Sequence, residues 1–144
     1  MLTGISPLLS PELLKTIAEM GHGDELVIGD GNFPAASMAQ RLVRADGHGV
    51  PDLLKAILAL FPLDRFVDKP VALMEVVAGN PTVPTIWDEY RMIVQESQPE
   101  RIAHGFDMVE RFAFYERSKL AYAIVATGES ALYANVILKK GVIG

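Results

Sequence analysis

The sequence contains no cysteine, which excludes disulfide bonds, thiolate nucleophiles and cysteine-ligated zinc sites. It also has no basic cluster, because 18 acidic residues outnumber 13 basic ones and Lys139-Lys140 is the only adjacent basic pair. Affinity for phosphate backbones depends on clustered Lys and Arg. We therefore expect no nucleic-acid partner.

Long hydrophobic runs are missing as well. No apolar run reaches the roughly 18 residues of a membrane helix, and the first residues have neither the basic nor the long apolar segment of a signal peptide. These absences predict no membrane partner and a cytoplasmic location. Yet 50% of the 144 residues are hydrophobic and the mean hydropathy is +0.25. That value is high for a small monomer and predicts apolar surface buried between subunits.

Hydrophobic periodicity divides the chain into alternating strands and helices, with a loop over residues 30–37. The predicted helices cover residues 11–20, 51–61, 85–97 and 115–122, and the predicted strands cover residues 25–29, 41–45, 71–77, 108–114, 123–127 and 133–142. Near-continuous apolar strands indicate a sheet covered on both faces. We predict a single α/β domain over residues 1–144, with a mostly parallel central sheet and helices on both faces.

Two polar residues flank the first predicted strand, "ELVIG". Asp30 follows the strand, where ligands collect in open α/β sheets, although "GDGN" also suits a turn-forming aspartate. His22 precedes the strand in "GHG". It is either a general acid/base or a loop histidine bonded to a carbonyl. His22, His48 and His104 are scattered without ligand spacing, so we expect no metal site.

Further polar candidates lie in the second half of the chain. "RFAFYER" contains Arg111, which can bond hydroxyls, and Tyr115, which can stack or hydrogen-bond. The segment is otherwise a packed aromatic strand followed by a helix start. Tyr133 and Asn135 in "YAN" offer neutral donors and acceptors, which suit a polyol ligand. Phosphate-loop and nucleophile-elbow motifs are absent. Pattern alone thus predicts an α/β domain with a polar small-molecule pocket.

Four segments add a family resemblance. They are "ISPLLSPELLKTIAEMGHGDELVIGDGNFPA", "RADG" with "VPDLLKAIL", "RFAFYER", and "TGESALYANVILKKGV". In this order they closely resemble the fucose mutarotase and ribose pyranase family over nearly the whole chain. The match is weakest over residues 66–106. Tyr115 favours the fucose branch, because the ribose branch typically has histidine there.

The resemblance implies an isomerase, a mutarotase that interconverts the anomers of a monosaccharide, with L-fucose as the expected substrate and no metal or cofactor. It assigns catalysis to His22 and sugar binding to Asp30, Arg111, Tyr133, Ala134 and Asn135. We add Tyr115 to the expected binding residues because its ring can stack on a sugar and its hydroxyl can hydrogen-bond. Tyr133 is our candidate for the proton-transfer partner of His22. The family forms ring-like homodecamers with sites near subunit boundaries, so we expect self-association.

One alternative uses the same pocket without catalysis. A monosaccharide-binding module linked to sugar sensing or transport would need Asp30, Arg111 and Asn135 to hold the sugar. It would not need His22 to titrate near neutral pH. The sequence does not separate these two functions.

Overall fold

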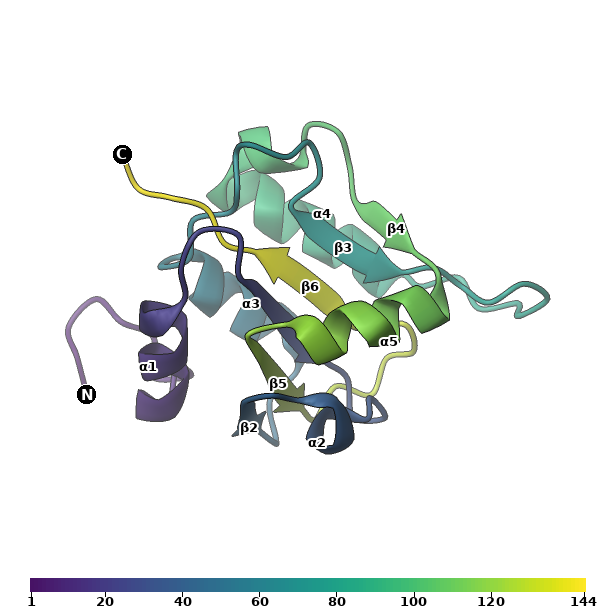
Figure 1. The fold of residues 1–144 in the computed structure, drawn as a ribbon, viewed down its shortest axis with the longest axis horizontal. Helices are drawn as coiled ribbons and strands as arrows, with labels where there is room; N and C mark the ends of the chain where they lie inside the picture. The colour runs from purple at the N-terminus through teal and green to yellow at the C-terminus, as the bar shows by residue number, and fades with distance from the viewer.

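The computed structural model describes residues 1–144, which form one six-stranded sheet with helices on both sides (Figure 1). The strands are β1 (Glu25–Gly29), β2 (Leu42–Ala45), β3 (Val71–Met74), β4 (Asp107–Val109), β5 (Ala123–Thr127) and β6 (Val136–Lys139). The helices are α1 (Pro11–Glu19), α2 (Ala35–Met38), α3 (Val50–Leu58), α4 (Ile86–Ser97) and α5 (Arg111–Leu120), with a 3-10 turn, η1 (Pro99–Ile102). None of the helices has the length and apolar character needed to cross a bilayer.

The strands follow the order β2-β5-β1-β6-β3-β4 across the sheet. β1 pairs in parallel with β5, β5 with β2, and β3 with β4. β6 lies between β1 and β3 and is antiparallel to both. The predicted mostly parallel sheet is therefore confirmed, with one antiparallel strand at its centre.

Alternate residues of each strand face two separate apolar layers. In β1, Leu26 and Ile28 join the larger cluster, which also holds the buried residues of α1, α3 and α4. Val27 joins the smaller cluster on the opposite face, with Phe114 of α5 and Ala35 of α2. Figure 1 shows α5 and α2 in front of the sheet and α3 and α4 behind it. Helices on both faces are thus confirmed.

The segment around "RFAFYER" departs from prediction. A strand over 108–114 was expected, but β4 ends at Val109 and α5 begins at Arg111. The Glu110 carboxylate caps the helix by accepting a hydrogen bond from the Ala113 N–H, at 3.0 Å. We predicted a strand because aromatic residues favour strands. The Glu110 cap and the burial of one side chain per turn, Phe114 and Ser118, favour the observed helix.

Other element boundaries also shifted. The strand expected over 71–77 ends at Met74, the strand expected over 133–142 begins only at Val136, and the loop expected over 30–37 contains the short helix α2. The two strands are shorter because polar or turn-forming residues lie at their ends, whereas α2 is one short helical turn within the expected loop.

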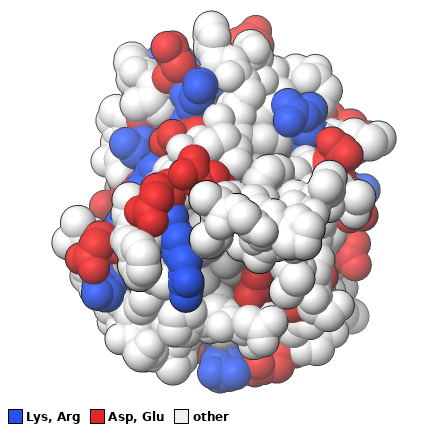
Figure 2. All heavy atoms as spheres, turned by 90° about the vertical axis from the view of Figure 1, so that its right-hand side faces the viewer, with Lys and Arg blue, Asp and Glu red and all other residues white.

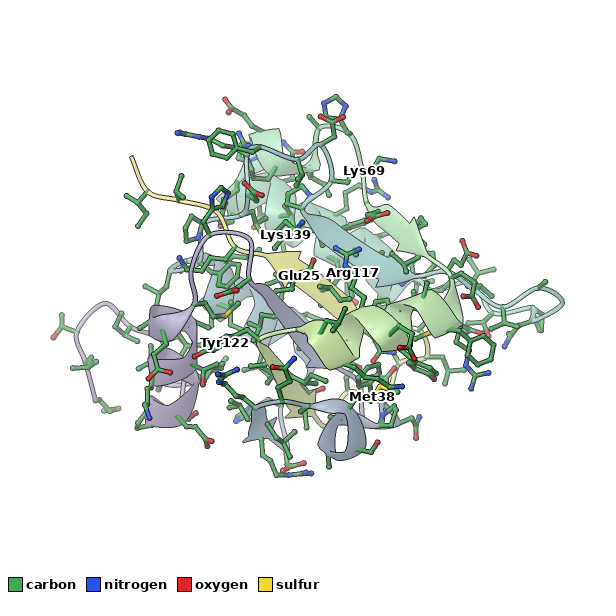
Figure 3. The ribbon with its side chains drawn as sticks, in the orientation of Figure 1. Glu25, Met38, Lys69, Arg117, Tyr122 and Lys139 are labelled. Atoms are coloured by element: carbon green, nitrogen blue, oxygen red, sulfur yellow. The ribbon has the colours of Figure 1, made fainter.

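Helix α5 is fastened to the sheet by one arginine. Arg117 Nη2 lies 2.6 Å from Glu25 Oε2 of β1, and Arg117 Nη1 lies 3.0 Å from Asp107 Oδ2 of β4. Figure 3 shows Glu25 and Arg117 pointing toward each other between β1 and α5. Such charge-assisted bonds fix geometry as well as adding stability. They fasten the last turn of α5 to the first residues of β1 and β4, at the end of these strands opposite Asp30.

Candidate functional site

Strand direction gathers the predicted binding residues at one edge of the sheet. Asp30 directly follows β1, and Arg111 begins α5 just after β4, so both lie beyond carboxyl ends of parallel strands. Because β6 is antiparallel to its neighbours, its amino end lies at this same edge. The residues that precede β6, from Tyr133 to Asn135, therefore meet Asp30.

These side chains surround an open pocket of about 270 Å³. Its lining comes from loops after β1 and β3, from α5 and from the segment before β6: Asp30, Asn32, Phe33, Met74, Val77, Asn80, Arg111, Tyr115, Leu132, Tyr133 and Asn135. Of the predicted binding residues, only Ala134 does not line the pocket. It is fully buried behind the wall and contributes backbone groups.

Asp30 is the most buried charged group of the pocket, with 7% of its surface exposed. Its backbone N–H donates to Asn135 Oδ1 at 2.8 Å, and its Oδ1 accepts from the Asn32 N–H at 3.0 Å. Burial raises the pKa of the Asp30 carboxyl, while the backbone N–H groups of Asn32, Ala134 and Phe33 partly offset that rise. Asp30 is thus both the turn former and a fixed acceptor facing the pocket.

Tyr133 has an unusual backbone and a well-placed phenol. It is the only non-glycine residue with positive φ, at 55°. Its phenol oxygen accepts hydrogen bonds from Asn80 Nδ2, at 3.1 Å, and from the Val77 N–H, at 3.3 Å. Since both contacts come from donors, the phenol proton is free to bond a ligand.

Arg111 and Tyr115 form a pair one helical turn apart, with Arg111 Nε donating to the Tyr115 hydroxyl at 3.3 Å. That hydrogen bond raises the pKa of Arg111, so the guanidinium stays charged. Of the other aromatic residues in this segment, Phe112 is exposed and Phe114 is buried against Phe33. The apolar part of the pocket comes instead from other elements: Phe33, Met74, Val77 and Leu132.

His22 lies apart from this pocket within one chain. It precedes β1 while Asp30 follows it, and a five-residue strand spans roughly 16 Å. His22 Nε2 lies 3.1 Å from Oδ1 of Asp64, and its ring packs on Phe66 at 5.4 Å between centroids. We expect both residues to act on one sugar, which would require His22 opposite Asp30 in the pocket, and within a single chain it does not lie there.

Asp64 contacts His22 and is a candidate site residue that sequence reasoning missed. Only 5% of its side chain is exposed, and the same Oδ1 accepts from the Phe66 N–H at 3.1 Å. A buried carboxylate that orients an imidazole fixes which ring nitrogen is presented to solvent. The signal was present in "FPLDRF", where an acidic residue interrupts an apolar segment.

The charges around this edge are mixed in sign. Figure 2 looks onto the side of the molecule at the right of Figure 1, and there Lys and Arg atoms alternate with Asp and Glu atoms. The chain holds no group of three or more His, Asp or Glu side chains arranged to bind a metal ion. The polar side chains of the pocket offer hydrogen-bond donors and acceptors, among them the Asp30 carboxylate and the Tyr133 phenol.

Comparison with known proteins gives matches over nearly the full chain. The model of the RbsD / FucU transport protein family matches residues 3–143. A protein named L-fucose mutarotase from Actinobacillus pleuropneumoniae serotype 5b (strain L20) is 50% identical over 145 residues, covering 99% of this chain and 97% of that protein. The protein named fucose mutarotase from Homo sapiens is 49% identical over 148 residues, covering 99% of this chain and 94% of that protein.

A solved structure agrees with these relatives. The fucose mutarotase from Streptococcus pneumoniae in complex with L-fucose has a TM-score of 0.92 and 50% identity, covering 99% of this chain and 100% of that one. The similarity thus includes residues 66–106, where the resemblance was expected to be weakest.

Proposed function

Because this chain belongs to the RbsD / FucU transport protein family, we propose that it is a mutarotase that interconverts the anomers of L-fucose. The predicted resemblance to fucose mutarotases is confirmed by relatives that match nearly the whole chain. The observation that carries the proposal is the convergence of Asp30, Arg111, Tyr133 and Asn135 on one small pocket. Its volume of about 270 Å³ lies just below the range for drug-sized ligands, which suits a single sugar ring.

The pocket offers both charged and neutral partners for sugar hydroxyls. Asp30 accepts hydrogen bonds, Arg111 donates them, and the Asn135 amide can still donate while its oxygen holds the Asp30 N–H. The apolar lining, such as Met74 and Leu132, suits the methyl group of a 6-deoxy sugar. A polar rim with an apolar wall therefore supports L-fucose as the substrate.

Mutarotation needs two proton-transfer groups and no redox chemistry. A base takes the proton of the anomeric hydroxyl as the C1–O5 bond breaks, and an acid protonates O5, which gives the open aldehyde. Rotation about C1–C2 and the reverse transfers close the ring on the other face. We assign these roles to His22 and Tyr133, since imidazole exchanges protons near neutral pH and the Tyr133 phenol has a free proton.

The separation of His22 from Asp30 requires a second subunit. For both residues to touch one sugar, His22 with its Asp64 partner must come from a neighbouring copy that covers the pocket mouth. Exposed apolar residues at the two edges support such an interface: Phe66 beside His22, and Val77 and Leu132 at the pocket. We propose a homo-oligomer, a decamer, which light scattering would report as tenfold the 15.7 kDa chain mass.

We further propose a cytoplasmic location, testable by microscopy of a tagged chain.

Saturation transfer between the α and β anomers of L-fucose tests the activity by NMR. We expect exchange above the buffer rate, lost by about 10²–10⁴-fold in His22→Ala, as is typical when a general acid/base is removed. His104→Ala is the matched control, because His104 is exposed and lies outside the pocket. Line broadening without enhanced exchange in the parent protein would instead identify a sugar-binding module.

Sugar choice is tested in the same assay. L-Galactose carries a hydroxymethyl group where L-fucose has a methyl group, and an apolar wall rejects an added hydroxyl only modestly, by on the order of 1–3 kcal/mol. Equal enhancement for the two sugars would show that Met74 and Leu132 do not form such a wall.

A further inference from the structure

The backbone at Tyr133 adopts a conformation that a bulky residue rarely takes. Its φ of 55° lies in the left-handed region, where Cβ crowds the following carbonyl. Residues held there persist only when their surroundings fix them. The surroundings of Tyr133, Ala134 and Asn135 therefore contain groups that hold this segment.

Helix α4 supplies two such groups from behind the pocket. Trp87 Nε1 donates to the Tyr133 carbonyl at 2.8 Å, and the Tyr90 hydroxyl donates to the Ala134 carbonyl at 2.7 Å. Trp87 and Tyr90 are three residues apart, so they share one face of the helix. Tyr90 is fully buried, which raises its pKa and keeps its hydroxyl protonated as a donor.

These two bonds orient the peptide groups that face the pocket. In a trans peptide the C=O and N–H point in opposite directions. With the Tyr133 carbonyl held toward α4, the Ala134 N–H points away from α4, and it lowers the pKa of the Asp30 carboxyl. Asn135 comes next and accepts the Asp30 N–H at 2.8 Å.

We propose that Trp87 and Tyr90 are positioning residues, which hold the Tyr133–Asn135 segment in the shape that binds the sugar. Neither side chain lines the pocket, so each acts only through that segment. The inference rests on the proposed function, because it assigns sugar binding to Asp30 and Asn135. It also gives a role to α4, which lies in the segment where sequence reasoning identified no site residue.

The test compares Trp87→Phe and Tyr90→Phe with Val94→Ala. The first two variants keep an aromatic ring and lose one donor. Val94 is a fully buried residue of α4 with no bond to the segment, so its truncation weakens helix packing alone. We expect each donor variant to raise KM for L-fucose about three- to tenfold, the range for one neutral hydrogen bond. The kcat should fall less, because the Tyr133 phenol keeps its own bonds.

Val94→Ala should lower Tm more than Trp87→Phe does and leave KM within about twofold, since it removes core volume and no donor. The double variant Trp87→Phe/Tyr90→Phe should raise KM by less than the product of the single effects, because both residues restrain one segment. Parental KM in Trp87→Phe and Tyr90→Phe, or an equal rise in Val94→Ala, would overturn the inference.

Two readouts separate this inference from the activity itself. Hydrogen–deuterium exchange of residues 131–136 without sugar should accelerate in Trp87→Phe and not in Val94→Ala. Parental exchange rates in Trp87→Phe would show that Trp87 does not restrain the segment. Calorimetric titration with L-fucose gives Kd for each variant. If the parent binds L-fucose without exchanging its anomers, the proposed function fails, and weaker binding by Trp87→Phe still supports the inference.

Discussion

Mixing two impaired variants should restore activity. His22→Ala removes the proposed acid/base, and Asp30→Asn removes a sugar-binding carboxylate from the opposite end of β1. A strand of five residues spans roughly 16 Å, so a sugar ring in the Asp30 pocket does not reach His22 of the same chain. Each site then draws on two chains, and a mixed oligomer rebuilds some sites from intact halves.

The expected recovery follows from this division. In an equal mixture, half of the pockets carry intact Asp30 and half of the covering neighbours carry intact His22. If copies assemble at random, about one quarter of the sites are complete, and activity reaches about one quarter of the parent's. The recovered activity should be proportional to the product of the fractions of the two variants in the mixture. It should therefore be highest at equal amounts and lower at any other ratio.

The assay uses co-expressed chains with two different tags, purified over both so that only mixed oligomers remain. Anomer exchange is measured below KM, where the weaker binding of Asp30→Asn has its full effect. Each variant carrying both tags serves as the control for the tags. Mixed oligomers no more active than the mean of the two variants would refute the shared site. His22 would then act within its own chain or not at all.

Three further predictions concern stability and the supporting residues. Burial raises the pKa of the Asp30 carboxyl above its ordinary 3.8. The folded chain therefore binds the carboxyl proton more tightly than the unfolded chain does, and the folded state loses stability as the pH rises above 3.8. Asp30→Asn should therefore raise Tm at pH 7 relative to the parent but not at pH 3. Gly141→Ala would place a Cβ 2.6 Å from the Leu63 carbonyl oxygen and 2.8 Å from Asp64 Cα. It should cost about 1–3 kcal/mol in urea unfolding and lower kcat by moving Asp64. Arg117→Met leaves Glu25 unpaired and should cost about 1–3 kcal/mol, less than a fully buried pair because both groups are partly exposed.

Each of these has a contradicting result. Equal Tm gains for Asp30→Asn at both pH values would exclude the proton linkage. A Gly141→Ala variant with parental kcat would show that Asp64 tolerates the shift. If Arg117→Met/Glu25→Gln is no more stable than Arg117→Met alone, the unpaired carboxylate is not the cause of the loss.

The central strands were predictable because burial on both faces leaves a plain apolar run. "AIVAT" and "VALM" are buried at every position of β5 and β3, and "ELVIG" at all but its first residue. Turn-forming residues around these runs placed Asp30 at a strand end correctly. Local pattern and observed structure agree where the hydrophobic effect alone decides the element.

Prediction failed where long-range contacts decide. α5 has few buried residues, Phe114 and Ser118 among them, and depends on the pairing of Arg117 with two acidic residues from distant strands. The hydrophobic periodicity of a sequence does not indicate which charged residues pair over long distances. The direction of β6 was equally hidden, because an apolar strand reads the same in either direction.

The candidate site divides in the same way. Residue type and position relative to the predicted strands identified four residues that the fold brings together in the pocket: Asp30, Arg111, Tyr133 and Asn135. His22 lies at the other end of β1, and the second copy that we propose to bring it to this pocket is not encoded in the periodicity of one chain.

The central place of β6 has a consequence for biosynthesis. β1 and β3 do not pair with each other, and β6 joins them through its antiparallel ladders. Until the ribosome has added residues 136–139, the two halves of the sheet present unpaired inner edges, and such edges invite pairing with other chains. The nascent chain thus gains its pocket and loses its most aggregation-prone edges in one late event, the insertion of a single short strand.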